Sequence, residues 1–142
     1  MPATLSGAIS ASASALNAER IRVEVAVSNL ANAESTRGPN GEPYRRREVV
    51  LESAGTQAFA GALGQAMGVR VAAVVEDPSP FKQLYDPAHP DAGEDGIVRM
   101  PNVNTNEEVV DLLSASRAYQ ANLAAVNIIR DMVQKALDLG RG

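Results

Sequence analysis

The placement of proline is the feature that most limits how this 142-residue chain can fold. Of the eight prolines, only Pro2 lies outside residues 39–101. The proline ring removes a backbone N–H and clashes with the preceding turn, so proline is excluded from helix interiors. Two long proline-free segments remain at the ends, and the sequence predicts a helix, an irregular middle and a second helix.

The N-terminal segment carries apolar residues at alternating spacings of three and four, the a/d pattern of a coiled-coil seam. This spacing predicts an amphipathic helix over residues 3–33, about 45 Å long. Asn29, Asn32 and the Gly38-Pro39 pair are expected to stop it. The residues at this spacing, interrupted by Arg20, are Ile9, Ala13, Leu16, Val23, Val27 and Leu30.

The C-terminal segment repeats the pattern and predicts a helix of about 50 Å. Thr105 followed by Glu108 is typical of a capping box, and Gly140 offers a helix-ending left-handed position. Arg20 and Arg130, which interrupt the two stripes, are expected to pair with acidic residues on an adjacent helix. The stripe consists of Val109, Leu112, Ser116, Tyr119, Leu123, Val126, Val133 and Leu137.

Between the helices, β-branched residues bounded by turn formers predict strands at residues 44–53 and 68–77, with 97–100 as a third. Residues 81–96, FKQLYDPAHPDAGEDG, are interpreted as a loop. The expected fold is mainly α with a small β-rich insert, in which the long terminal helices pair as a coiled coil. The expected parts are 1–35, 36–103 and 104–142.

Composition argues against several classes of protein. The net charge of −4 disfavours a nucleic-acid binder, and Arg45, Arg46 and Arg47 would split across two faces of a strand. The chain has no cysteine, so a disulfide framework and a zinc-cysteine site are excluded. No apolar run approaches the roughly 20 residues that span a bilayer, and no cleaved secretion signal is expected.

The residues offer little for catalysis. His89 is the sole histidine and lies in a proline-bounded loop without a nucleophile motif, and no phosphate-cradling glycine run is present. We therefore expect no enzyme, cofactor or metal site. An acidic turn, defined as Asp86, Asp91, Glu94 and Asp95, leaves open a small hydrolase or a hard-cation site, although its spacing does not match an EF-hand.

The helical stripes allow two interpretations, an intramolecular core or an assembly surface. Three features favour assembly. The stripes are narrow, alanines permit close helix approach, and the middle has little aromatic mass to cover the helices, since Trp is absent and only three Tyr and two Phe are present. A discrete, self-associating coiled-coil scaffold would share these heptads.

Two motifs make the chain resemble the flagellar basal-body rod proteins along essentially its whole length. The first is SNLANAESTRG at residues 28–38, where the family usually reads close to Ala-Asn-x-x-Ala-Asn-x-x-Thr-x-Gly, with Glu34 and Ser35 replacing the commoner Asn-Thr. The second is the Ser-Arg-x-Tyr-Gln-Ala-Asn run at residues 116–122, which follows NVNTNEEVVDLL. The tail GPNGEPYRR resembles the proximal-rod branch more than the distal-rod or hook branches.

The resemblance implies a structural rod subunit, exported by the flagellar type III apparatus without a cleaved signal. Such subunits polymerise in the periplasm into a helical tube that transmits torque and encloses the export channel. It implies that the terminal helices order on assembly and that the partners are copies of the chain, other rod proteins, the export apparatus, and the MS-ring and export-gate proteins. The expected subunit or helix interface comprises Ile9, Leu16, Val23, Val27, Asn29, Leu30, Asn32, Arg45, Arg46, Arg47, Val109, Leu112, Tyr119, Gln120, Asn122, Leu123, Val126 and Val133.

Overall fold

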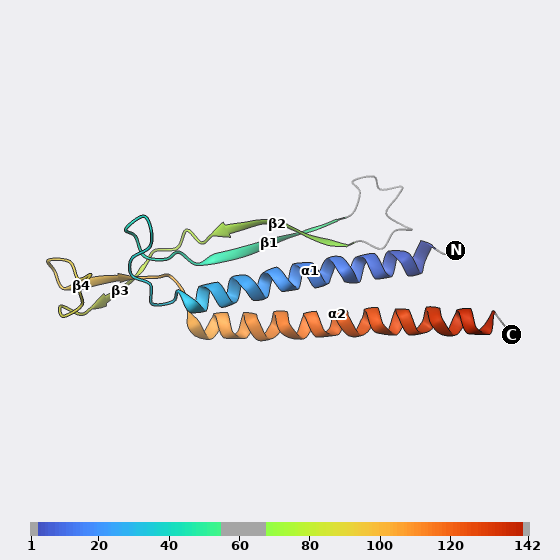
Figure 1. Ribbon diagram of the computed structural model, residues 1–142. Coiled ribbons are helices and arrows are strands. Elements are labelled where there is room, and N and C mark those ends of the chain that lie inside the picture. The colour runs from blue at the N-terminus through green and yellow to red at the C-terminus, as the bar shows by residue number, and fades with distance from the viewer. Residues whose placement is uncertain (1–2, 55–67, 141–142) are drawn as a thin grey trace.

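The computed structural model describes residues 3–54 and 68–140. Two long helices flank a β-rich insert, as the sequence predicts, so the expected fold class is confirmed (Figure 1). In chain order the elements are α1 (Ala3–Ala31), β1 (Arg47–Ser53), β2 (Val69–Glu76), β3 (Lys82–Tyr85), β4 (Ile97–Met100) and α2 (Thr105–Leu139).

The helices α1 and α2 run antiparallel along each other, which brings the two ends of the chain to the same end of the molecule (Figure 1). Small side chains make this contact. Ala18, Ala26 and Ala115 are among the few fully buried apolar residues, and alanine lets two helix backbones approach closely. The buried and half-buried positions of α2 include a complete heptad series: Glu108, Leu112, Ala115, Tyr119, Asn122, Val126, Ile129 and Val133.

The strands β1 and β2 form an antiparallel ribbon, with Arg47 opposite Glu76 and Ser53 opposite Val69. The ribbon lies along α1, and its contacts within the described residues are with α1 and not α2. The Ser14 hydroxyl accepts a hydrogen bond from the Val69 backbone N–H at 3.0 Å, which anchors β2 to the helix. The helix α1 is therefore covered on one side by α2 and on another by the ribbon.

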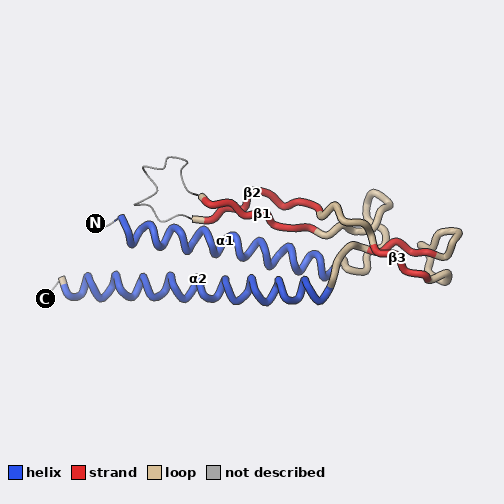
Figure 2. Tube along the Cα trace, turned by 180° about the vertical axis from the view of Figure 1, so that it is seen from behind, coloured by secondary structure: helices blue, strands red, loops and turns tan. Residues whose placement is uncertain are grey.

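The strands β3 and β4 form a second antiparallel pair at the end of the molecule away from the chain termini (Figure 2). Val98 in β4 and Val103 just beyond it are buried. The three predicted strands are confirmed, but the interpretation of residues 81–96 as a loop was wrong at its start, because Lys82–Tyr85 is a strand. The segment KQLY does not alternate apolar and polar residues, because all four of its side chains are exposed and none needs to face a core.

The helix ends and one ion pair differ from expectation. The N-cap of α2 is Asn104, whose side chain accepts a hydrogen bond from Asn106 N–H and donates one to Glu107, so the predicted Thr105–Glu108 capping box is wrong by one residue. Gly140 ends α2 in the right-handed region, with φ −81°, and not in the left-handed region. Arg20 pairs with Glu24 of its own helix at 2.5 Å. The three-part division of the chain stays a prediction.

The close packing at Ala115 predicts intolerance of larger side chains. Ala115→Leu adds three carbons where 1% of the residue is exposed, so it should lower the free energy of unfolding by about 1–3 kcal/mol, measured by urea denaturation. The matched control is Ala121→Leu on the exposed side of α2, expected to stay within about 0.5 kcal/mol of the parent. Equal stability of the two variants would contradict the packing described.

Candidate assembly surface and the polar junction beside it

The side-chain amide of Asn29 links α1 to the rest of the fold. It is 1% exposed, and its nitrogen donates to the Arg47 carbonyl and to Glu108 Oε2, both at 2.9 Å. Its oxygen accepts from the Arg47 N–H at 3.0 Å and from the Tyr44 hydroxyl at 2.9 Å. All four hydrogen-bonding positions of the amide are used. Asn29 pairs with both backbone groups of Arg47, as a neighbouring strand would.

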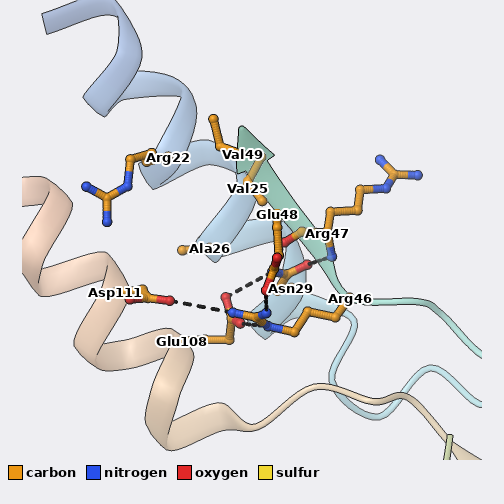
Figure 3. A pocket seen from close by; sticks show the side chains of 10 residues that line it. All are labelled: Arg22, Val25, Ala26, Asn29, Arg46, Arg47, Glu48, Val49, Glu108 and Asp111. Atoms are coloured by element: carbon orange, nitrogen blue, oxygen red, sulfur yellow. Dashed lines mark hydrogen bonds and ion pairs between the residues drawn. The ribbon is translucent and has the colours of Figure 1, made fainter. Parts of the chain in front are cut away.

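Glu108 and Arg46 complete this polar junction, defined as Asn29, Arg46 and Glu108 (Figure 3). The Glu108 side chain is 2% exposed, and its Oε1 accepts from Arg46 Nε at 2.5 Å. Because a buried carboxylate is costly unless it is paired and hydrogen-bonded, these two partners allow a charge to stand in the helix seam. The junction joins the start of β1 and both helices.

Further carboxylates surround the Arg46 guanidinium. It pairs with Glu48, and it lies 3.6 Å from both Asp77 and Asp111. Burial by itself lowers the pKa of Arg46, but its hydrogen bond and charge interaction with Glu108, and then with Glu48, raise it above the ordinary value. Arg46 is therefore a permanent cation that pairs with carboxylates of its own chain.

Asp77 and Asn102 hold the backbone around Arg46. Hydrogen bonds from Ser79 lower the pKa of Asp77 below its ordinary value, and the Arg46 charge adds to this effect. Asn102 accepts from the Arg46 N–H at 2.8 Å and donates to the Asp77 carbonyl at 3.1 Å. The segments before β1, after β2 and before α2 thus meet at one place.

The rest of the Asn-rich motif shapes the loop after α1. Asn32 donates to the Ser28 carbonyl at 2.8 Å and closes the last turn of the helix. Beyond it, Asp91 accepts from the Thr36 hydroxyl at 2.7 Å and pairs with Arg37 at 2.7 Å. His89 Nδ1 accepts from the Asp91 N–H at 3.0 Å. These contacts give Asp91 and His89 a structural use in holding two loops together.

The predicted interface residues fall into four groups in the single chain. Most apolar members are half-buried beside the helix seam, and Asn29 and Arg46 lie in the polar junction. Asn32, Arg45 and Asn122 are half-buried outside that junction, and the others are exposed. Contact between subunits is not tested by a single chain, so their role in assembly stays a prediction. The exposed group consists of Ile9, Val27, Arg47, Val109, Gln120 and Leu123.

Several exposed apolar residues share one side of the helix pair, which we call the free flank: Ile9, Val27, Val109, Leu113 and Leu123. On α1, Val27 is two residues from Asn29, which faces the ribbon. At about 100° per residue, Val27 therefore points to the opposite side. On α2, Val109 and Leu113 are each two residues from Asp111, which faces Arg46. The exposed fractions of Val27, Val109 and Leu113 are 49%, 43% and 52%.

The hollow at the polar junction has a volume of about 190 Å³ and lies between α1, β1 and α2 (Figure 3). Six of its ten lining residues are charged, and Arg46 pairs with Glu48, Glu108 and Asp111 among them. The lining contains no serine, cysteine or histidine. The Arg47 guanidinium points away from it (Figure 3). The arrangement serves to fix the geometry of the helices and is not suited to nucleophilic catalysis.

Sequence reasoning missed Glu108, Tyr44, Asn102 and Asp77 as members of this region. Glu108 was assigned to a helix cap because the S/T-x-x-E spacing fits one. A signal for its burial was present, because Glu108 lies in the same three-and-four series as Leu112, Tyr119 and Val126. A charged residue at such a position requires a buried partner.

Loss of the Glu108 charge should weaken the fold. Glu108→Gln leaves the Arg46 guanidinium, whose side chain is 16% exposed, without its buried counterion, and we expect a loss of about 2–3 kcal/mol in the free energy of unfolding. Urea denaturation measures this loss. The exposed Asp131→Asn on the same helix is the control and should change stability little. A Glu108→Gln variant as stable as the control would refute this role.

Comparison with known proteins identifies the family. Residues 94–139 match the family described as "Flagellar basal body rod FlgEFG protein C-terminal", and residues 9–39 match "Flagella basal body rod protein". The described residues contain no helix long and apolar enough to cross a membrane.

Relatives that align along nearly the whole chain belong to the same family. The flagellar basal-body rod protein FlgC of Bacillus subtilis is 44% identical, with 94% of this chain and 96% of the relative aligned. FlgC of Salmonella typhimurium is 46% identical over 90% of this chain and 92% of the relative, and FlgC of Borreliella burgdorferi is 38% identical over 97% and 99%. The chain therefore belongs to the flagellar basal-body rod proteins, in the FlgC family.

Proposed function

We propose that this chain is a structural subunit of the flagellar basal-body rod and that it contacts neighbouring subunits through the free flank. Family membership carries the first part of the proposal. The exposure of large apolar side chains along both helices carries the second.

The division of residues between the seam and the free flank supports this proposal. Alanines and polar residues such as Glu108 fill parts of the seam inside the chain, while Val27, Leu113 and Leu123 face outward. Contiguous exposed apolar side chains on a helix pair mark an interaction surface. A helix from a neighbouring subunit laid along this flank would bury them, and a repeated contact that does not close into a ring generates a helical assembly.

The finer partners follow from the family resemblance. We propose contacts with copies of this chain and with other rod proteins, export through the flagellar type III apparatus, and a place beside the MS-ring and export-gate proteins. The rod role needs no catalytic group, and the residues of the polar junction serve structure. A non-flagellar scaffold would account for the heptads but not for family matches at both ends of the chain.

Mass spectrometry of purified, detergent-resistant basal bodies tests the proposed function directly. We expect the chain in the rod fraction at several copies per basal body. A chain found only as a soluble cytoplasmic protein would contradict a rod role and would favour the free-standing scaffold.

Charge on the free flank should block assembly without blocking export. Leu123→Asp places a carboxylate in the proposed contact, so we expect export to continue and the amount of chain in purified basal bodies to fall at least tenfold. Ile128→Asp is the matched control, since Ile128 is an exposed apolar residue of the same helix that lies about 140° around it. Normal motility of Leu123→Asp, or an equal loss in both variants, would contradict the assignment.

A further inference from the structure

The guanidinium groups of Arg45 and Arg99 both lie over the ring of Phe81, next to the first residue of β3. The Arg45 guanidinium carbon lies 4.4 Å from the centre of the Phe81 ring, and that of Arg99 lies 4.9 Å from it. A phenyl face attracts one cation, but two guanidiniums this close to the same ring repel each other. The arrangement holds more positive charge than the ring alone balances.

The chain supplies no carboxylate partner to either arginine among the described residues. Arg45 donates to the carbonyl oxygens of Asp77 and Ser79, at 3.1 and 3.2 Å, which fixes its position without neutralising it. Arg99 is exposed. The arginines that form ion pairs in the described part of the chain are Arg20, Arg22, Arg37, Arg46 and Arg70.

These residues line a hollow, which we call the Phe81 pocket. Its volume is about 270 Å³, and its walls are Arg45, Pro78, Ser79, Pro80, Phe81, Gln83 and Arg99. Pro78 and Pro80 restrict the backbone of one wall, so the pocket that the two guanidiniums line has one rigid side. A preformed pocket with two guanidiniums, one ring and no counterion suits a carboxylate, which a guanidinium can bind through two parallel hydrogen bonds.

The acidic turn, which joins β3 to β4, offers such a carboxylate. Asp91 already binds Arg37 and Thr36, Asp86 accepts from the Ala88 N–H and Asp95 accepts from the Ile97 N–H. Glu94 is exposed at the corner of a turn closed by the Gly96 N–H and the Gly93 carbonyl at 2.9 Å. Among the described residues, Glu94 is therefore the member of the turn whose carboxylate has no hydrogen-bond or ion-pair partner within the chain.

We infer that the Phe81 pocket binds the Glu94 carboxylate of a second copy of this chain. Gln83 and Arg99 of the pocket lie opposite each other in the strand pair that ends in this turn, so a neighbour whose β3–β4 pair lies alongside can bring its turn over the pocket. Each copy offers one pocket and one carboxylate, which gives a head-to-tail contact that can repeat. This inference rests on the proposed rod function and names one contact within it.

Charge reversal and its exchange test the contact in cells that carry only the variant chain. Arg99→Glu and Glu94→Arg, tested singly, should each lower the copy number per purified basal body by about fivefold. The double variant Arg99→Glu with Glu94→Arg restores a pair of opposite charges, so its copy number per basal body should return to most of the wild-type value. The control is Arg117→Glu, an exposed arginine on α2 outside the pocket, which should assemble normally.

Two further measurements keep the outcomes distinct. Circular dichroism of the purified variants and the amount exported establish that folding and export are unchanged, as expected for exposed positions. If Arg99→Glu assembles at the wild-type copy number, the proposed contact is wrong. The same holds if the double variant assembles at no higher copy number than the weaker single variant. Either result leaves the rod function standing. Absence of the parent chain from basal bodies would instead overturn the proposed function.

Discussion

The buried pairing of Arg46 with Glu108, held in place by Asn29, is the interaction on which the rest of the structure depends. A carboxylate that is 2% exposed in a helix seam is tolerated only while its partners remain in place. Those partners come from α1 and from the residue before β1, so the charge of Glu108 fixes the register of α2 against both. The ribbon then follows α1 because Asn29 pairs with the backbone of Arg47.

Much of the fold could be predicted from proline placement and heptad spacing, because both act locally along the chain. The two helices follow from these patterns, and three of the four strands follow from β-branched runs bounded by turn formers. The strand β3 does not, because all its residues are exposed and prolines stand on either side of it. Its pairing depends on β4, which lies more than ten residues away, and local sequence carries no record of such a partner.

The site was harder to predict than the helices, for a related reason. A search for large apolar residues finds Val109 and Leu123, whereas the buried residues at neighbouring heptad positions are Glu108 and Ala115, with Asn122 half-buried. The stripe visible in the sequence therefore belongs partly to the free flank. Glu108 could be recognised only by asking why a charge stands in a heptad series, and its partner Arg46 is 62 residues away.

This distribution of residues has a consequence for assembly. Hydrophobic stabilisation grows with the apolar area removed from water, and the alanines and polar groups of the seam remove less of it within one chain than large apolar residues would. Val27, Leu113 and Leu123 stay exposed in the single chain and are available for a neighbour to cover. The polar junction contributes orientation, since sliding α2 along α1 would leave Asn29 and Glu108 buried and unpaired. The chain thus fixes its geometry alone, and under the proposed function its exposed apolar flank is covered by other subunits.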